Sequence, residues 1–269
     1  MPIHYEKDDE HVVLITMDRP HRKNALDFEH FGDLALAWRR FAEDDDAWVA
    51  ILTGVGDSYC AGADLRDLVP MFKELGERVA RGETELNGRP LTAGTDAVLR
   101  SYQVYKPIIA AVNGPCVAGG MEMLGGIDIR IACPEAVFGV MEPRRGLFAG
   151  GGTTARLPRQ LGWPAAMEFL LTAEGLPAQR ALELGAINEI VPREQLLDRA
   201  REWARRITVN APLAIQGTKE SALRCFAAGS LNDAYEIESE ISKRVFATED
   251  AVEGPKAFAE KRPPAWKGR

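Results

Sequence analysis

The chain has 269 residues, of which 46% are hydrophobic and 27% charged, so it is long and apolar enough to bury one large core. Its net charge of -7 excludes the global positive field that is typical of nucleic-acid-binding proteins, so an anionic ligand would need local cations and backbone N–H groups. The four cysteines form no CxxC pair and sit among apolar residues, which favours reduced thiols in a cytoplasmic protein over disulfides or a metal site.

The first part of the chain alternates strand and helix patterns. Residues 1–9 are polar and acidic, and we expect no signal peptide there. Residues 11–17 and 48–53 are rich in β-branched and apolar residues and predict strands, while 28–43 has helical periodicity with Asp27 as a plausible N-cap. The order strand, helix, strand indicates a right-handed βαβ unit and a parallel sheet.

Segment 65–97 interrupts this pattern. It is polar, contains several glycines and prolines, and has no strong periodicity. A long segment of this kind beside a site is often a mobile lid. A helical surface insertion without a function fits the composition equally well, and both interpretations stay open.

Beyond this segment the pattern recurs and then changes to helices. The predicted strands are 107–112, 127–132, 136–140 and 188–191. The predicted helices are 119–124, 153–161, 164–173, 177–184, 194–209, 212–228 and 232–248. The pattern predicts an α/β core followed by a mostly helical C-terminal third.

Glu122 is the only charged residue between Lys106 and Asp128. It makes the apolar stretch 107–127 a poor membrane span. A carboxylate in such surroundings is costly unless it is paired, protonated or used, and desolvation would raise its pKa toward the range of a general acid or base. A glutamate on a solvated helix face, or one that accepts hydrogen bonds near a helix N-terminus, is the alternative.

Small residues follow two of the predicted strands, at 58–65 and 113–122, and let the backbone approach a ligand closely. One N–H from Ala63 and one from Gly119 could together hold a developing oxyanion. The nearby Gly54-Val55-Gly56 lacks the third glycine of a dinucleotide-binding fingerprint, since Tyr59 stands in its place.

Glu142 follows predicted strand 136–140 and precedes a run of glycines that leads into a helix. A turn carboxylate near Arg144 and Arg145 is the simpler interpretation of this residue taken alone. All four histidines lie at or before His30, with no GxSxG elbow and no metal-ligand spacing, so a nucleophilic triad or a metal site is not supported. Carboxylates remain for proton transfer.

Taken together, these motifs resemble the crotonase (enoyl-CoA hydratase/isomerase) family over nearly the whole chain. The resemblance is carried by Arg19-Pro20, Asn24-Ala25-Leu26, residues 60–65, Asn113-Gly114, residues 118–122, Phe138-Gly139, Glu142, Gly146, residues 150–157, Glu253-Gly254, Ala257-Phe258 and Glu260-Lys261-Arg262. It implies a crotonase/ClpP-like α/β spiral of ββα units, with a core over residues 1–200 and a helical trimerisation region over 201–269.

The resemblance also implies an activity. Glu122 and Glu142 match both glutamates of the family's hydratases, so we expect a lyase that adds water across the 2,3 double bond of a 2-enoyl-CoA, as in the β-oxidation of fatty acids. The backbone N–H groups of Ala63 and Gly119 would bind the thioester carbonyl. The residues expected along coenzyme A are Arg22, Lys23, Ala25, Ala61, Ala63, Asp64, Leu65, Arg66, Gly119 and Lys261.

The resemblance implies no prosthetic group, since coenzyme A belongs to the substrate, and no metal, nucleic acid or membrane. It implies a cytoplasmic homotrimer or dimer of trimers. Ala118 and Ala149 depart from the family's common glycine and proline, and the long segment 65–97 leaves the acyl group open. An isomerase, a hydratase of a specialised acyl-CoA (carnitine-, steroid- or aromatic-derived), and a non-catalytic acyl-CoA-binding protein remain the alternatives.

Overall fold

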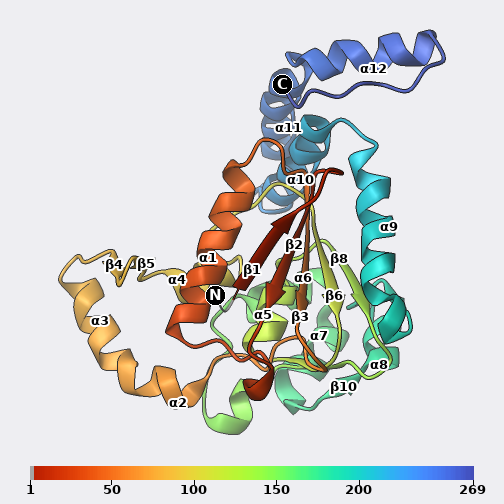
Figure 1. The fold of residues 1–269 in the computed structure, drawn as a ribbon. Coiled ribbons are helices and arrows are strands. Elements are labelled where there is room, and N and C mark those ends of the chain that lie inside the picture. The colour runs from red at the N-terminus through yellow and green to blue at the C-terminus, as the bar shows by residue number, and fades with distance from the viewer. Residues whose placement is uncertain (1–2) are drawn as a thin grey trace.

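A six-stranded sheet forms the centre of the computed structural model, which describes residues 3–269 (Figure 1). Its strands lie in the order β1-β2-β3-β6-β8-β11, with β1 antiparallel to β2 and the remaining pairs parallel. Their bounds are Ile3–Lys7, Val12–Met17, Val49–Gly54, Ile108–Val112, Ile129–Ala132 and Glu189–Ile190. Every residue of β3 and β6 is buried, which explains their unbroken apolar runs.

Helices cover both faces of this sheet. Helix α1 (Phe28–Glu43) has the predicted bounds, and Asp27 caps it by accepting a hydrogen bond from the His30 N–H. Its apolar side packs in the larger core, where Trp38 and Phe41 are fully buried. On the other face, α9 (Leu196–Thr208) packs its buried side chains against those of β3 and β6. The alternation of side chains along each strand therefore divides the core in two.

A second, three-stranded sheet carries the segments that matter for function. It consists of β10 (Leu176–Pro177), β9 (Val137–Gly139) and β7 (Cys116–Val117), with β7 parallel to β9. The short helix α5 (Gly119–Leu124) follows β7 directly. This sheet thus brings the start of α5 beside the chain that leads to Glu142.

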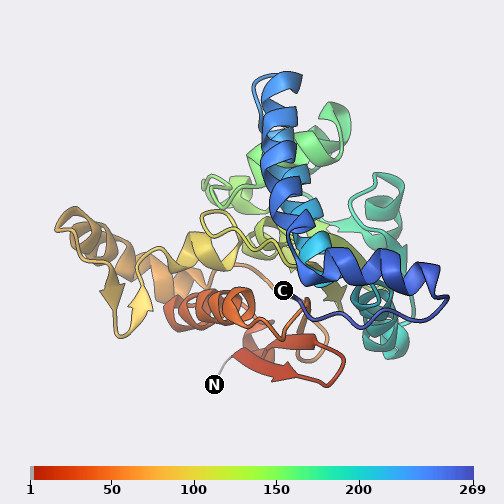
Figure 2. The ribbon, with the colours of Figure 1, turned by 90° about the horizontal axis from the view of Figure 1, so that it is seen from above.

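Segment 65–97 is an ordered excursion beside α1 (Figures 1 and 2). It contains helices α2 (Leu65–Leu68), α3 (Phe72–Ala80) and α4 (Ala93–Ala97), the 3₁₀ turn η2 (Val69–Met71) and the hairpin of β4 (Glu85–Leu86) and β5 (Arg89–Pro90). Its second half is tied to α1: the Trp38 indole N–H donates to the Ala97 carbonyl at 3.0 Å, and Arg89 pairs with Asp33 at 2.9 Å. Its interpretations as a lid and as a surface insertion both stay predictions.

The C-terminal third is helical, as predicted. Helices α6 (Thr153–Gln160), α7 (Trp163–Thr172), α8 (Ala178–Glu183) and α9 belong to the body of the molecule, and α9 runs across residue 200, the predicted boundary. Helices α10 (Pro212–Phe226), α11 (Leu231–Phe246) and α12 (Glu249–Ala259) form an arm that projects from one end (Figure 1). The division at residue 200 stays a prediction.

Strand β1 and helix α12 were not predicted. The polar composition of residues 1–9 concealed an edge strand in which Ile3 is buried and Glu6 and Lys7 face solvent. Thr248, placed at the end of the preceding helix, is instead the N-cap of α12 and accepts a hydrogen bond from the Ala251 N–H. Both elements depend on local signals that are weaker than apolar periodicity.

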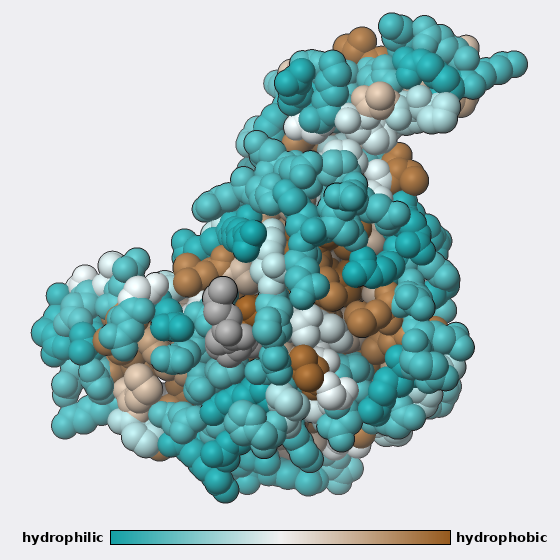
Figure 3. Space-filling view, viewed as in Figure 1, coloured by the Kyte–Doolittle hydropathy of each residue, from teal (hydrophilic) through white to brown (hydrophobic). Residues whose placement is uncertain are grey.

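The arm exposes several large apolar side chains, including Phe226, Phe246 and Phe258, the last of which is 87% exposed. Figure 3 shows apolar atoms on this arm within a mainly hydrophilic surface. Within residues 3–269, no helix combines the length and hydropathy that a membrane crossing requires.

Candidate active site

Two loops that follow neighbouring strands run side by side and form one wall of the site. The Val117 N–H donates to the Cys60 carbonyl at 3.0 Å, and the Cys60 N–H donates to the Pro115 carbonyl at 3.1 Å. A third segment joins them, because the Leu26 N–H donates to the Gly62 carbonyl at 2.8 Å. These main-chain bonds hold the chain around Ala63 and Gly119 in one arrangement.

The two loops touch where they carry the proposed amide donors. A Cβ atom on Gly62 would lie 2.9 Å from the Gly119 nitrogen, and Gly62 has a φ of +89°. Only glycine fits at this position, because of both the space and the backbone conformation. Among the described residues, neither the Ala63 N–H nor the Gly119 N–H has a hydrogen-bond acceptor. Two free donors therefore stand close together.

Ala118 lies between the loops and α5. Its φ of 51° and ψ of −121° are a backbone conformation that residues other than glycine rarely adopt. Its N–H donates to the Gly139 carbonyl at 2.8 Å, and its carbonyl accepts from the Glu122 N–H at 3.0 Å. These two bonds keep the strained residue in place.

A cavity of ≈380 Å³ opens beside the two donors. Its lining comes from both loops, from α5 and from the chain after β9, and consists of Ala61, Ala63, Leu65, Val117, Ala118, Gly119, Glu122, Met141, Glu142, Arg145, Leu147, Phe148 and Gly150. Glu122 enters from α5, and Glu142 is the first residue of the 3₁₀ helix η3 (Glu142–Arg145). The fold thus brings both glutamates and both amide donors to a single cavity.

The Glu122 carboxylate is held by a glycine that lies 29 residues further along the chain. Its Oε1 accepts a hydrogen bond from the Gly151 N–H. A Cβ atom on Gly151 would collide with the Glu122 carboxylate, so a side chain there would displace this carboxylate. Burial raises the pKa of Glu122, while the Gly151 N–H and the charges of Arg100 and Arg156 oppose that rise.

The Glu142 carboxyl group is more isolated. Its side-chain atom Oε2 is buried and has no hydrogen-bond partner among the described residues. Burial raises the pKa of Glu142 to about 7, and the charge of Glu122 adds to the rise, while its own N–H and the charge of Arg145 oppose it. The two carboxyl groups therefore interact, and near neutral pH their proton uptake is a property of the pair.

The other predicted site residues fall into two groups. Ala61 and Leu65 line the cavity, as do Ala63 and Gly119. The remaining ones lie outside its lining: Arg22, Lys23, Ala25, Asp64, Arg66 and Lys261. Lys261 follows α12, which Figure 1 places at the opposite end of the molecule from α2.

Several predicted residues outside the cavity lining make hydrogen bonds or ion pairs with segments around the cavity. The Lys23 carbonyl accepts a hydrogen bond from the Ala61 N–H at 3.0 Å, which places exposed Arg22 and Lys23 beside the wall of the cavity. Asp64 caps α2 by accepting from the Arg66 N–H at 3.2 Å. It also binds the Arg19 guanidinium at 2.8 Å. Asp64 thus joins elements around the site.

The sequence interpretation assigned no role to several residues that shape the site. Arg19 lies between Asp27 and Asp64 and also contacts Asp67 at 3.0 Å, so it joins three segments. Arg156 of α6 donates to the Glu122 carbonyl at 3.2 Å and to the Val98 carbonyl at 3.0 Å, which fixes the position of α5. An arginine within an amphipathic helix carries no local signal for such a contact.

Asn24 and Asn113 also act on the backbone. The Asn24 side-chain amide donates to the Ser58 carbonyl at 2.6 Å, and that of Asn113 donates to the Gly54 and Gly56 carbonyls at 2.7 and 2.9 Å. Both asparagines thereby hold the turn after β3 that leads to Ala63. In the sequence, only their places in the motifs Asn24-Ala25-Leu26 and Asn113-Gly114 indicated a role for them.

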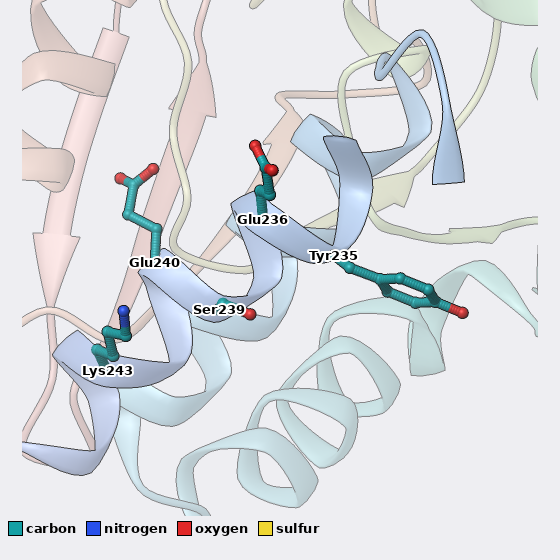
Figure 4. Close-up of a pocket in the computed structure, with 5 residues that line it drawn as sticks. All are labelled: Tyr235, Glu236, Ser239, Glu240 and Lys243. Carbon is teal, nitrogen blue, oxygen red and sulfur yellow. The ribbon is translucent and has the colours of Figure 1, made fainter. Parts of the chain in front are cut away.

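Neither of two other cavities combines a pair of glutamates with the free N–H groups of Ala63 and Gly119. One on the exposed side of α11 is lined by Tyr235, Glu236, Ser239, Glu240 and Lys243, and Figure 4 shows Tyr235 pointing away from the two glutamates. A larger one of ≈730 Å³ lies between α10 and the body. In residues 3–269, no cluster of three or more His, Cys, Asp or Glu side chains is arranged to hold a metal ion.

Comparison with known proteins gives a consistent result. A profile of the enoyl-CoA hydratase/isomerase family matches residues 7–269. Enoyl-CoA hydratase EchA19 of Mycobacterium tuberculosis is 39% identical over 96% of this chain and 94% of its own length. The (E)-benzylidenesuccinyl-CoA hydratase of Thauera aromatica is 36% identical over the full length of both chains.

Solved structures agree with these relatives. The crystal structure of an enoyl-CoA hydratase from Bacillus anthracis matches with a TM-score of 0.89 at 31% identity, and the match covers 100% of both chains. The predicted fold class, an α/β spiral with a helical C-terminal region, is confirmed.

Proposed function

The chain belongs to the enoyl-CoA hydratase/isomerase family, whose members act on coenzyme A thioesters, and on this premise we propose that it hydrates a 2-enoyl-CoA to a 3-hydroxyacyl-CoA. The observation that carries the proposal is the convergence of two carboxyl groups and two free backbone donors on one cavity. An acyl-CoA provides a group for each pair: a thioester oxygen for the donors and an activated double bond for the carboxyl groups.

The thioester carbonyl binds to the Ala63 and Gly119 N–H groups. These bonds withdraw electrons from the conjugated system, so C3 becomes electrophilic, and they strengthen as negative charge develops on the oxygen. The loss of one preorganised donor of this type lowers transition-state stabilisation by about 3–4 kcal/mol in other enzymes. The main-chain bonds around Gly62 keep both donors in place before the substrate arrives.

Glu122 and Glu142 together hold one water molecule against C3. Glu122, held by the Gly151 N–H, acts in its carboxylate form and removes a proton from that water as its oxygen bonds to C3. Glu142, whose pKa of about 7 leaves much of it protonated near neutrality, gives its proton to C2. The proton gained by Glu122 then passes to Glu142, and the pair returns to its starting state.

The remainder of coenzyme A leaves the cavity along Ala61 to Leu65. The exposed side chains of Arg22, Lys23 and Arg66 lie beside this exit and bind the phosphates of coenzyme A. The exposed apolar side chains of the arm make contacts between copies in a trimer or dimer of trimers. In such an assembly, Lys261 of a neighbouring copy reaches the nucleotide.

The direct test is turnover of crotonyl-CoA and longer 2-enoyl-CoAs. Hydration removes the conjugated thioester absorbance and adds the mass of one water molecule, whereas isomerisation leaves the mass unchanged. Loss of absorbance together with the mass gain supports the proposal. Mass-neutral conversion across the panel supports an isomerase and overturns it.

A hydratase of a specialised acyl-CoA is the second candidate. The wall of the cavity formed by Arg145, Leu147 and Phe148 is exposed and does not define a short, closed acyl pocket. A relative named for benzylidenesuccinyl-CoA agrees with this alternative. A non-catalytic acyl-CoA-binding protein is a third possibility, and calorimetric binding of coenzyme A without any turnover would support it.

A further inference from the structure

Of the residues that the structure describes, Arg145 is the only cationic one in the lining of the active-site cavity. It ends the 3₁₀ helix that begins with Glu142, and it shares this part of the lining with Leu147 and Phe148. We call these three residues the outer wall. In the proposed hydratase the thioester oxygen binds the two amide donors and the reacting carbons lie at the glutamates, so the part of the acyl chain beyond C3 would contact the outer wall.

The Arg145 guanidinium has most of its hydrogen-bonding capacity available. Its Nη1 donates to the Met141 carbonyl at 3.0 Å, and it forms no ion pair with any carboxylate among the described residues. Arginine has five N–H donors, and one of them serves this bond. Arg144, its neighbour, lies 3.6 Å from the Glu174 carboxylate and does not line the cavity.

The chemistry around Arg145 favours an anionic group. Met141, Leu147 and Phe148 offer no polar side-chain group to a ligand, and the two glutamates would repel a second carboxylate unless a cation compensated for them. A guanidinium binds a carboxylate through two parallel hydrogen bonds, which gives direction as well as energy. Because Arg145 is exposed, a purely hydrocarbon acyl chain would leave this cation solvated by water alone.

We propose that the substrate is a 2-enoyl-CoA whose acyl chain carries a carboxylate beyond C3, and that Arg145 binds this carboxylate. This inference rests on the proposed hydratase activity and narrows its substrate class. Arg145 thereby selects the substrate, while Glu122 and Glu142 perform the reaction.

Arg145 also stands close enough to Glu142 for its charge to oppose the rise in the pKa of that group. If this were its whole role, a change at Arg145 would alter the turnover of every enoyl-CoA by the same factor. A carboxylate-binding role changes the ratio between carboxylated and neutral substrates instead. The two roles are therefore separable by comparing substrates in one variant.

The experiment measures kcat and KM for crotonyl-CoA, for 2-hexenedioyl-CoA with its free terminal carboxylate, and for the methyl ester of the latter. The proteins are the wild type, Arg145→Gln, Arg145→Lys and the matched control Arg144→Gln, each checked for folding by circular dichroism. We expect the wild type to prefer the free acid to the ester. In Arg145→Gln this preference falls about 10- to 100-fold, mainly through KM, the effect of losing a hydrogen bond to a charged group.

Arg145→Lys should keep part of the preference, because it keeps the charge without the paired geometry. Arg144→Gln should keep all of it. A wild type that hydrates crotonyl-CoA but treats acid and ester alike would overturn the inference and leave the proposed function standing. Equal losses on all three substrates in Arg145→Gln would also overturn it. Absence of hydration of all three by the wild type would refute the proposed function itself.

Discussion

The two walls of the active-site cavity are built in different ways. The inner wall, residues 60–63 and 115–119, is fixed by main-chain hydrogen bonds between loops, and Gly62 and Gly119 are buried in it. The outer wall is exposed, with Phe148 77% accessible to solvent. Within residues 3–269, the Arg145 side chain bonds only to the carbonyl four residues before it. The inner wall can hold a fixed reaction geometry, whereas the outer wall can change without disturbing the core.

The reaction and the choice of substrate therefore reside in separable parts of the cavity. Changes on the inner side should reduce turnover of every substrate. Changes on the outer side should alter preference among substrates and leave stability nearly intact.

The largest effect is expected from the two glutamates. Glu122→Gln and Glu142→Gln should each lower kcat for crotonyl-CoA about 10²- to 10⁴-fold, because each removes a positioned proton-transfer group. The double variant should lose much less than the product of the two factors, since the residues act as a unit. Glu174→Gln, an exposed carboxylate nearby that does not line the cavity, is the control. Full activity in either single variant would refute the mechanism.

A smaller loss is expected from Gly151→Ala. The new methyl group would collide with the Glu122 carboxylate, so the carboxylate must move. A displacement of this order lowers turnover by up to about 10²-fold, and we expect a loss between about 10- and 100-fold in kcat. Gly94→Ala, where an added Cβ meets no atom within 4 Å, controls for the substitution itself. Wild-type kcat in Gly151→Ala would show that the position of Glu122 is unimportant.

The pH dependence of kcat/KM should be bell-shaped. The proposed reaction needs Glu142 protonated, and its pKa of about 7 means that this form is lost as the pH rises through that value. Activity should then fall about tenfold for each further pH unit. The acid limb reports the protonation of Glu122. A profile that stays flat through neutrality would contradict these assignments.

Arg145→Gln tests the link between the two walls in the same experiment. Removal of this cation takes away one influence that lowers the pKa of Glu142, so the alkaline limb should move to higher pH. Arg144→Gln should leave the limb where it is. A limb that does not move in Arg145→Gln would mean that the outer wall has no electrostatic effect on the inner chemistry.

The smallest effect is expected from Phe148→Ala. The side chain is largely exposed, so the free energy of unfolding should change by less than about 0.5 kcal/mol, and thermal denaturation should show nearly the same Tm. Because Phe148 lines the cavity, KM for a long apolar enoyl-CoA should rise more than KM for crotonyl-CoA. A large loss of kcat with crotonyl-CoA would place Phe148 in the reaction and break the comparison.

The features of this protein that depend on local patterns could be predicted from its amino-acid sequence. The apolar runs of β3 and β6 and the helical periodicity of α1 predicted the core. A strand that is buried on both faces is apolar along its length, and a helix that is buried on one side carries apolar residues at a regular spacing. The isolation of Glu122 among apolar residues marked it for chemistry. The joint order of many short motifs identified the family, which the comparisons confirm.

Features that depend on contacts between distant segments became visible in the folded structure. No local pattern shows that the Gly151 N–H holds Glu122, that Arg19 joins three acidic side chains, or that Arg145 faces the cavity while Arg144 pairs with Glu174. Local conformation follows from a residue and its near neighbours. The position of a charge relative to a cavity follows from the packing of sheets and helices, which residues far apart in the chain determine together.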